Sequence, residues 1–452
     1  MFSAYSIRFW DVDAGKELLR PPGHNSSADA VAFSPSGKSV ATVGDDATLC
    51  LWGATTGRNR WCVNEVKDGR HFLSLFFARG GRCVATNHDP VVFDLWDFAT
   101  GEKTEQWPLR QAGLVLRSKP EGDYLPFWAI NENREEMTAY RLDVAAGESI
   151  GPGVGPYFMP GPSFHPTPAT RVIFSRDGLR AAVSDSWKRI DLLDLQTNEV
   201  LQTIEAARGT GREDTILDFA LSPDGTVVAS SWTSRHTHGI PEECKGVRLW
   251  DTASGRLLCQ IDPKAFAMCP VWKLAFSPDG RILATLSGSV IGLWEVASGK
   301  SLGQFAEENN GCTWDFAFAP DGERLATPMN DGSTLIWDCK PSGWQPPKGK
   351  LTADDLTQLW QDLGDLNAEI AYHAVYTLAA APEEAVPFLS ERVKSVATWS
   401  SLRGVWALQR IGTPEARKSL SDLAAGVDEA RLTREAKNAL DWLDRRAKLP
   451  RE

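Results

Sequence analysis

The residues best suited to chemistry lie together between Arg235 and Cys244, in the stretch RHTHGIPEEC. His236 and His238 are followed there by two glutamates and Cys244, and these side chains are ligand types that zinc and other transition metals accept. Their spacing matches no standard zinc site. The sequence therefore favours a solvated surface loop, and it leaves a metal site built from His236, His238 and Cys244 as the alternative.

Two further stretches resemble the end of a phosphate-binding loop without completing one. Gly37-Lys38-Ser39 and Gly299-Lys300-Ser301 share the Gly-Lys-Ser order, but Ala32 and Trp294 stand where the loop needs its first glycine. The sequence also contains no serine-hydrolase elbow, zinc-protease motif or kinase motif set. We therefore expect no catalytic residues, no cofactor and no enzymatic activity.

The composition is that of a globular protein with at least two domains. The chain has 452 residues, of which 42% are hydrophobic and 24% are charged, whereas a single core stops growing near ~250–300 residues. A net charge of −11, without a Lys/Arg cluster, argues against nucleic-acid and membrane partners. The eight cysteines are scattered without a CxxC pair, which predicts reduced thiols in a cytoplasmic protein.

A repeated unit organises most of the chain, and the stretch from Phe276 to Lys300 shows it most clearly. A Pro-Asp-Gly turn, an alternating strand, a strand ending in Leu-Trp-Glu and a second Gly turn follow one another there. The Trp-containing strand recurs along the chain: Trp10 and Trp52 are 42 residues apart, and Trp250 and Trp294 are 44 apart. A period near 40–45 residues is typical of the four-stranded blades of a β-propeller.

With its FSPDG turns, its LWD strand ends and its Gly23-His24 pair, the sequence resembles WD40-repeat proteins over roughly residues 5–340. Complete three-strand sets begin near residues 30, 73, 114, 171, 217, 273 and 315, which predicts a seven-bladed WD40-like β-propeller. Residues 16–20 would close the last blade as its outer strand, and residues 5–11 would be a surplus strand. An eight-bladed ring with one broken blade is the alternative. Because the chain begins inside a repeat, we expect its natural start to be missing.

The resemblance also implies a hydrogen-bonded set that WD40 repeats build from a histidine, a hydroxyl, an aspartate and the strand tryptophan. Only one blade matches it in full, with His24, Thr42, Asp46 and Trp52. The resemblance gives these residues a structural role and no catalytic one.

Enlarged connections fall in units four to six of the predicted propeller, at residues 131–136, 150–170, 205–214 and 235–244. Propeller topology places all four on one face, and function on rigid scaffolds tends to lie on such loops. We therefore expect this face to bind a protein partner, with insertion drift on a tolerant face as the alternative. The expected contact residues are Tyr157, Phe158, Met159, Phe164, Arg212, Trp232, His236 and His238.

The composition changes at Pro341, where a Pro- and Gly-rich linker over 341–350 precedes helical periodicity over 351–452. Thr352 is the expected N-cap of the first helix. Segments beginning at Ala374 and Gly404 resemble each other, and such paired helices resemble HEAT-like repeats. The whole tail is similar to the C-terminal region of certain large bacterial WD40 proteins.

The sequence thus predicts a multidomain β + α protein: a propeller over 1–340, a linker over 341–350 and an all-α HEAT-like domain over 351–452. The predicted function is a non-catalytic protein–protein interaction scaffold or adaptor. The alternative is a metal- or small-molecule-dependent enzyme or sensor that uses the loop-rich face near His236 and His238. A third possibility is that the tail only packs on the propeller as a cap.

Overall fold

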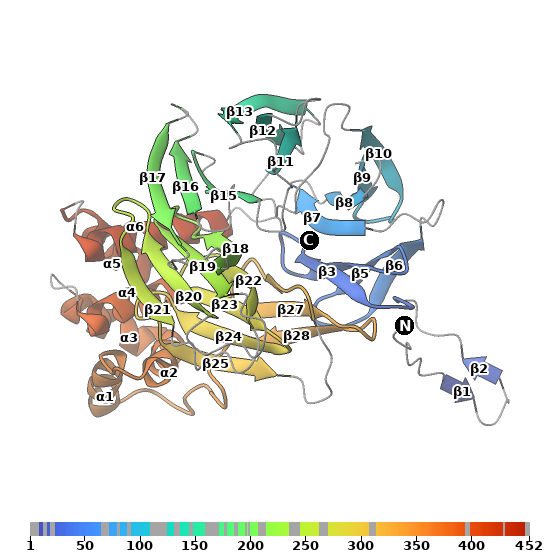
Figure 1. The fold of residues 1–452 in the computed structure, drawn as a ribbon. Helices are drawn as coiled ribbons and strands as arrows, with labels where there is room; N and C mark the ends of the chain where they lie inside the picture. Colours follow the sequence, from blue (N-terminus) through green and yellow to red (C-terminus); the bar gives the residue numbers. More distant parts are fainter. Residues whose placement is uncertain are drawn as a thin grey trace.

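The structure, a computed structural model, consists of antiparallel sheets followed by a helical domain (Figure 1). It describes residues 9–11, 16–18, 23–64, 72–78, 82–87, 92–108, 124–130, 136–143, 148–158, 171–175, 179–184, 189–194, 197, 199–206, 214–234, 245–261, 270–306, 313–393, 398–427 and 430–447. Every statement of number or absence below refers to these residues.

The strands follow one another in chain order within each sheet, and seven sheets of three or four strands are described. The first sheet holds β3 (Ala28–Phe33), β4 (Ser39–Gly44), β5 (Thr48–Gly53) and β6 (Asn59–Asn64). The second holds β7 (Phe72–Ala78), β8 (Arg82–Asn87), β9 (Val92–Asp97) and β10 (Lys103–Pro108). The third holds β11 (Tyr124–Ile130), β12 (Glu136–Asp143) and β13 (Glu148–Phe158).

The second half of the series repeats this arrangement. The fourth sheet holds β14 (Arg171–Phe174), β15 (Arg180–Ser184), β16 (Arg189–Asp194) and β17 (Val200–Glu205). The fifth holds β18 (Asp214–Leu221), β19 (Val227–Ser234), β20 (Lys245–Asp251) and β21 (Leu257–Ile261). The sixth holds β22 (Val271–Phe276), β23 (Ile282–Ser287), β24 (Val290–Glu295) and β25 (Ser301–Ala306), and the seventh holds β26 (Ala317–Phe318), β27 (Arg324–Pro328) and β28 (Thr334–Asp338).

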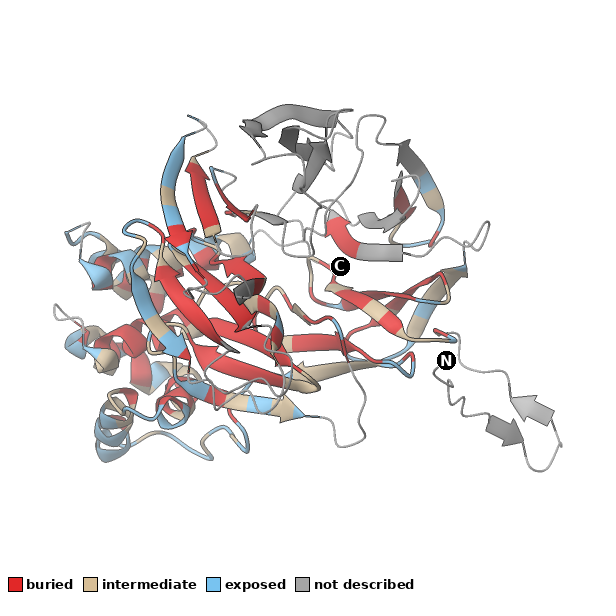
Figure 2. Cartoon of the chain, viewed as in Figure 1, coloured by how far each residue is buried: buried red, intermediate tan, exposed pale blue. Residues whose placement is uncertain are grey.

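The sixth sheet shows why the repeat folds as it does. Its FSPDG turn joins β22 to β23, and Gly280 has a φ of 74°, in the left-handed region that glycine reaches without steric strain. Every residue of β23 is buried, because both faces of an inner strand are covered in the stack of sheets. The outer strand β25 alternates between exposed and buried positions at its start. Buried residues accordingly concentrate in the inner strands (Figure 2).

The first and seventh sheets lie against each other although they are far apart in the chain. The backbone N–H of Ala28 donates to the carbonyl of Met329 at 3.1 Å, and Nη2 of Arg324 donates to the carbonyl of Gly37 at 2.8 Å. Val31 of the first sheet and Ala326 of the seventh also belong to one buried cluster. The first and seventh sheets are therefore in direct contact.

The N-terminal strands differ from the prediction that residues 16–20 pair with the last sheet. β2 (Lys16–Leu18) pairs instead with β1 (Phe9–Asp11) in a separate hairpin. Because only four residues separate β1 from β2, closing this hairpin loses less chain entropy than pairing with a strand some 300 residues away. Within the described part of the chain, β28 pairs with β27 alone, and the seventh sheet has three strands.

The third sheet also differs from the sequence reading. Residues 150–158, which were expected to be part of a connection, belong to strand β13. This strand pairs with β12 through two register irregularities. These irregularities accommodate the Gly- and Pro-rich stretch within a ladder. The strand expected near residue 114 lies outside the described residues.

Six helices are described after the linker: α1 (Ala353–Leu363), α2 (Ala368–Ala379), α3 (Pro382–Arg392), α4 (Trp399–Ile411), α5 (Pro414–Ala424) and α6 (Arg431–Ala447). The predicted N-cap is confirmed, since Thr352 and Asp355 form a reciprocal capping box. Gly412 ends α4 at a φ of 64°. None of the described helices is long and apolar enough to cross a membrane.

The helical domain packs directly on the sixth and seventh sheets, and one hydrophobic core runs through both. Leu293 of β24 and Leu325 of β27 belong to the same buried cluster as Tyr372 of α2 and Val405 of α4. Figure 1 shows the helices beside the sheets that contain β20 to β25. The tail is therefore attached to the sheets by a shared core.

A buried ion pair fixes this attachment. Nε and Nη2 of Arg403 in α4 donate to the two carboxylate oxygens of Glu295 at 2.7 and 2.8 Å. Nη1 of Arg403 donates to the carbonyls of Leu363 at 2.8 Å and Asp365 at 2.7 Å. Arg403 and Glu295 are each only 3% exposed, so this charge pair is held in a desolvated environment with its donors satisfied.

Turns of three successive sheets add polar contacts to the helices. Each turn supplies one carboxylate from its Pro-Asp-Gly segment or from the residue after it. The pairs are Asn438 donating to Asp224 at 2.8 Å, Gln409 donating to Asp279 at 3.4 Å, and Arg410 bridging to Glu323 at 3.2 Å. The helical domain therefore covers the turn side of the fifth to seventh sheets.

Candidate functional site

Most of the expected contact residues lie outside the described part of the chain. These are Met159, Phe164, Arg212, His236 and His238, together with the possible metal ligand Cys244. Tyr157 and Phe158 end β13, but their side chains are not described. No group of three or more His, Cys, Asp or Glu residues that could hold a metal occurs in the described ranges.

Trp232 is described, and it differs from the expectation that it offers a contact surface. Its side chain is only 6% exposed, and the guanidinium of Arg248 lies 4.6 Å from its ring centroid. Trp232 stands on β19, an inner strand that pairs with β18 and β20, and the guanidinium that covers its ring comes from β20 of the same sheet. Trp232 is therefore buried within the fold.

The structure brings His24, Thr42, Asp46 and Trp52 together at one end of the first sheet. Nε2 of His24 lies 2.7 Å from Oγ1 of Thr42, and Nε1 of Trp52 donates to the same oxygen at 2.8 Å. Nδ1 of His24 lies 3.4 Å from Oδ1 of Asp46 and 2.6 Å from Oγ1 of Thr48. The set joins the segment before β3 to strands β4 and β5 and to the turn between them.

The electrostatics of Asp46 fit a structural role. Burial alone would raise the pKa of Asp46, but hydrogen bonds from His24, Thr48 and the backbone of Asn25 outweigh burial and hold its pKa below the ordinary range. An aspartate that stays ionised and hydrogen-bonded is a poor proton donor or acceptor near neutral pH. These contacts tie the turn that holds Asp46 to the segment before β3.

The tryptophan–hydroxyl part of this set recurs in other sheets, which the sequence reading did not recognise. In each case the indole N–H of the strand tryptophan donates to a hydroxyl on the neighbouring inner strand. The pairs are Trp250 with Ser230 at 2.9 Å, Trp294 with Thr285 at 2.9 Å and Trp337 with Thr327 at 3.0 Å. Their repetition is further evidence of a structural role.

Two tryptophans that the sequence reading overlooked are exposed at, or just before, the first strand of their sheets. Trp272 in β22 is 47% exposed, and Trp314, just before β26, is 62% exposed. Aligning VWKLAFSPDG with TWDFAFAPDG places them at the same position of neighbouring units, where other units have Asp29 and Leu217. That alignment was available in the sequence and could have identified them.

The backbone beneath these tryptophans is held by polar contacts between neighbouring sheets. Asp218 accepts a hydrogen bond from the N–H of Leu274 at 2.8 Å, and Asp315 accepts one from the N–H of Val31 at 3.2 Å. Lys273 forms an ion pair with Asp315. Because Trp272 and Trp314 each adjoin one of these residues, the contacts hold the two indoles on fixed strands.

The tryptophans and the helical domain occupy opposite ends of the same strands. Trp272 stands at the start of β22, whereas Asp279, which contacts α4, lies in the turn after that strand. A strand of this length separates its ends by roughly 17–20 Å. The end with Trp272 and Trp314, which we call the tryptophan face, is therefore not the end that the helices cover.

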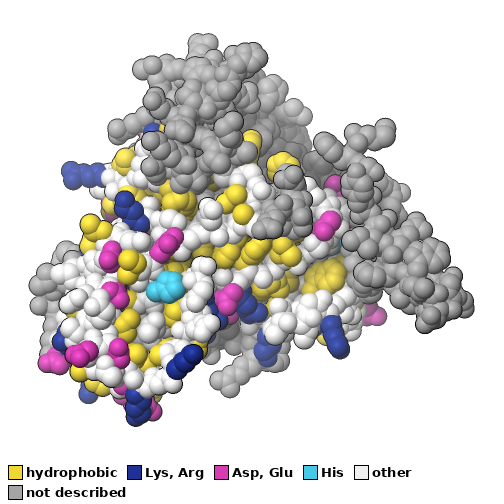
Figure 3. Space-filling model, turned by 90° about the horizontal axis from the view of Figure 1, so that it is seen from below, with side chains coloured by type: hydrophobic (Ala, Val, Ile, Leu, Met, Phe, Trp, Pro, Cys, Tyr) yellow, Lys and Arg dark blue, Asp and Glu magenta, His cyan; other side chains and the backbone are white. Residues whose placement is uncertain are grey.

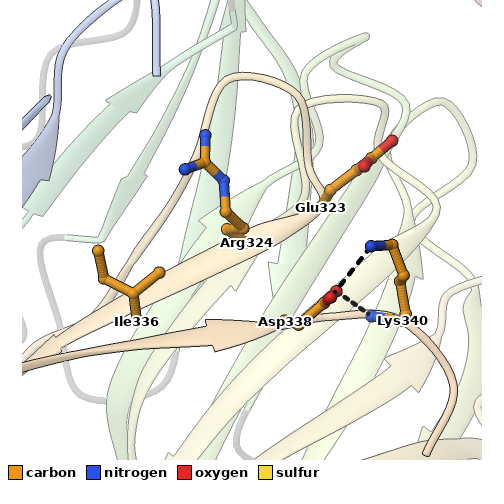
Figure 4. Close-up of a pocket in the computed structure, with 5 residues that line it drawn as sticks. All are labelled: Glu323, Arg324, Ile336, Asp338 and Lys340. Atoms are coloured by element: carbon orange, nitrogen blue, oxygen red, sulfur yellow. Dashed lines mark hydrogen bonds and ion pairs between the residues drawn. The ribbon is translucent and has the colours of Figure 1, made fainter. Parts of the chain in front are cut away.

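A shallow pocket beside β28 has no catalytic arrangement. It has a volume of about 180 Å³ and is lined by Glu323, Arg324, Ile336, Asp338 and Lys340 (Figure 4). Nζ of Lys340 bridges to Asp338 at 3.1 Å, and Arg324 bonds the carbonyl of Gly37. Its lining includes no cysteine, serine, threonine or histidine.

The expectation of reduced thiols is wrong for one pair of cysteines. Cys50 and Cys62 form a disulfide between β5 and β6, where they stand directly opposite each other in the register. Cross-strand neighbours are close enough for this bond, but the sequence alone did not give the register. Cys339 remains a buried free thiol, and burial raises its pKa, so it is a poor nucleophile.

Comparison with known proteins agrees with this repeat architecture. Residues 15–53 match the family model described as WD domain, G-beta repeat. Telomerase protein component 1 of Mus musculus is 21% identical over 348 residues, which is 74% of this chain and 12% of that protein. Apoptotic protease-activating factor 1 of Rattus norvegicus is 23% identical over 337 residues, or 74% of this chain and 24% of that protein.

A shorter match is to small ribosomal subunit protein RACK1y of Oryza sativa subsp. japonica, at 33% identity over 92 residues, which is 20% of this chain and 26% of that protein. The chain thus spans only 12% to 26% of the length of these three relatives. The chain is therefore similar to WD40-repeat proteins. The three relatives are eukaryotic, and the predicted bacterial type stays a prediction.

Proposed function

We propose that this chain is a non-catalytic protein-interaction scaffold whose partner contacts the tryptophan face. The observation that carries the proposal is the exposure of Trp272 and Trp314 at equivalent positions of neighbouring units. WD40-repeat proteins are generally interaction scaffolds, which supports the same reading. Tryptophan is enriched at the centres of protein interfaces, where a few aromatic anchors carry most of the binding free energy.

Trp272 and Trp314 leave apolar surface exposed that a partner could bury. A tryptophan side chain can bury about 150–250 Å², so exposing roughly half of it forgoes about 2–3 kcal/mol of burial free energy at ~25 cal/mol per Å². Two such side chains on neighbouring strands give a partner a paired anchor point. Cross-sheet contacts of Asp218 and Asp315 already hold the strands, so binding would order little of the backbone.

The enlarged connections of units four to six belong to this proposal. On a propeller, the parts of these connections outside the described strands, within residues 131–135, 159–170, 207–213 and 235–244, would rise from the same face as the tryptophans and extend the contact area. Among the expected contact residues, the apolar ones around Phe158 would add hydrophobic surface. The enzyme or sensor alternative near His236 and His238 has no support from the described residues and stays a prediction.

The proposed scaffold is a closed seven-bladed ring. Contacts between the first and seventh sheets support closure. The helical tail would be a HEAT-like stack that covers the opposite side.

A capture experiment tests the proposed function. The wild-type chain and a Trp272→Ala/Trp314→Ala variant are compared by affinity capture from a lysate of the source organism, with quantitative mass spectrometry of the bound proteins. Loss of an interface tryptophan that contributes about 2 kcal/mol lowers affinity roughly 30-fold, so the specific partner should disappear from the variant. Leu258→Ala is the matched control, because Leu258 is 53% exposed on the outer strand β21. An unchanged partner set in the double variant would contradict the proposal.

A further inference from the structure

A second surface, distant in the chain from the tryptophan face, has the features of a peptide site. A groove of about 370 Å³ lies between α1 and α2 on the helical domain. Its apolar lining includes Leu359, Ala374 and Ile370, and Ile370 is 41% exposed. Leu366, in the turn between the helices, is 80% exposed. Leu359 and Ile370 thus present apolar atoms in the groove above the buried Ala374, and Leu366 adds exposed apolar surface nearby.

The groove follows one side of α2. Ile370, His373, Ala374 and Thr377 all line it, and they stand at positions i, i+3, i+4 and i+7, which share one face of a helix. About two turns of α2 therefore contribute to the groove.

At Thr377, the groove already contacts a segment of the chain itself. Nε1 of Trp344, in the Pro-rich linker, donates to Oγ1 of Thr377 at 3.2 Å, and its ring packs edge-on against Tyr376 at 5.6 Å. The same linker places Lys350 in an ion pair with Glu383 at 3.6 Å. The helical domain thus holds the linker through an aromatic anchor at Thr377, a residue that also lines the groove.

The negative charge of the groove favours a cationic partner. Asp362 and Glu369 line it, and no Lys or Arg does. Over residues 353–392, which comprise α1 to α3, the sequence has eight Asp or Glu residues and one basic residue, Arg392. Seen from below, this end of the molecule shows magenta carboxylates beside yellow hydrophobic side chains (Figure 3). Such a field attracts cationic segments and repels acidic ones.

We propose that the α1–α2 groove is a docking site for a peptide segment of a partner protein, in which an apolar anchor is flanked by Lys or Arg. The anchor packs on Leu359, Ile370 and Ala374, and the cationic side chains pair with Asp362 and Glu369. The linker contacts α2 through Trp344 at Thr377, and we expect the partner segment to use its apolar anchor in the same way along the next turns of α2. This site is separate from the tryptophan face and does not depend on it.

The test measures fluorescence anisotropy of two labelled synthetic peptides with the full chain. Both contain a tryptophan between prolines; one has flanking lysines and the other has glutamates at the same places. The lysine peptide should bind saturably, at least tenfold more tightly than the glutamate peptide. Asp362→Lys/Glu369→Lys should weaken the lysine peptide at least tenfold and reverse the preference, and Ile370→Ser should weaken it at least fivefold.

Val427→Ser is the matched control, because Val427 is 69% exposed in the connection after α5 and lies outside the groove. It should leave binding of both peptides unchanged. All substituted positions are at the surface, and thermal unfolding of each variant checks that it is folded. Equal binding of the two peptides, or binding that the groove variants do not alter, would overturn the proposal. Self-association that Ile370→Ser abolishes would assign the groove to a second copy and also overturn it.

Discussion

Removing Arg403 should destabilise the whole protein, because this side chain joins the helical domain to the sixth sheet. Arg403→Met keeps the length and apolar stem of the side chain but deletes its charge. It leaves Glu295 with a buried charge from which both guanidinium donors, at 2.7 and 2.8 Å, have been removed. It also removes the donors to the carbonyls of Leu363 and Asp365.

The expected magnitude follows from these four bonds. Deleting one partner of a buried ion pair costs about 3–5 kcal/mol, because the remaining charge stays desolvated and uncompensated. The carbonyls of Leu363 and Asp365 also lose their donors, which lowers the free energy of unfolding further. In Arg403→Met/Glu295→Gln the remaining group is neutral, so we expect the double variant to recover about half of the loss.

Urea unfolding followed by far-UV circular dichroism and by tryptophan fluorescence measures the effect. Since one core links helices and sheets, the two signals should change together and shift together in Arg403→Met. The matched control is Arg417→Met, whose ion pair with Asp444 is exposed and should contribute less than about 1 kcal/mol. A loss below about 1 kcal/mol in Arg403→Met, or a helical signal that unfolds alone, would refute the reasoning.

Three further predictions concern other parts of the fold. Asp46→Asn should lower the free energy of unfolding by about 1–3 kcal/mol at neutral pH. Because the folded pKa of Asp46 lies below its unfolded value, this stability is present above about pH 4 and is lost as the pH falls further. The acid unfolding curves of the wild-type protein and the variant should therefore converge. Gly412→Ala should lower the free energy of unfolding by about 1 kcal/mol, since Gly412 has a φ of 64° and an added Cβ would lie 3.2 Å from Leu443. An unchanged midpoint of urea unfolding would contradict this. Reducing the Cys50–Cys62 disulfide, which closes a 12-residue separation, should lower stability by about 2–3 kcal/mol, and a Cys62→Ser variant should then be insensitive to reductant.

Local sequence signals predicted the sheets well where turn chemistry and strand alternation agree. The strand sets expected near residues 30, 73, 171, 217 and 273 fall in β3, β7, β14, β18 and β22, because in the sequence each is followed by a Gly-containing turn segment and a second apolar stretch. The capping residue Thr352 is likewise confirmed. These features depend only on neighbours in sequence.

Features that depend on distant neighbours were not predicted. Glu295 reads as the ordinary acidic end of a Trp-containing strand, and its ion pair depends on Arg403, 108 residues away. Trp232 reads as a surface residue beside a loop, but it is buried on the inner strand β19. Cys50 and Cys62 stand opposite each other only once β5 and β6 are aligned. In each case the missing information is pairing in space.

Site-specific photocrosslinking at the tryptophan face tests the central proposal most directly. A photoreactive phenylalanine analogue replaces Trp272, and the same analogue replaces Leu258 on the outer strand as the control. The account predicts a covalent partner adduct from position 272, competed by unlabelled wild-type protein, and none from position 258. Adducts of equal yield at both positions, or none at position 272, would contradict a binding role for this face.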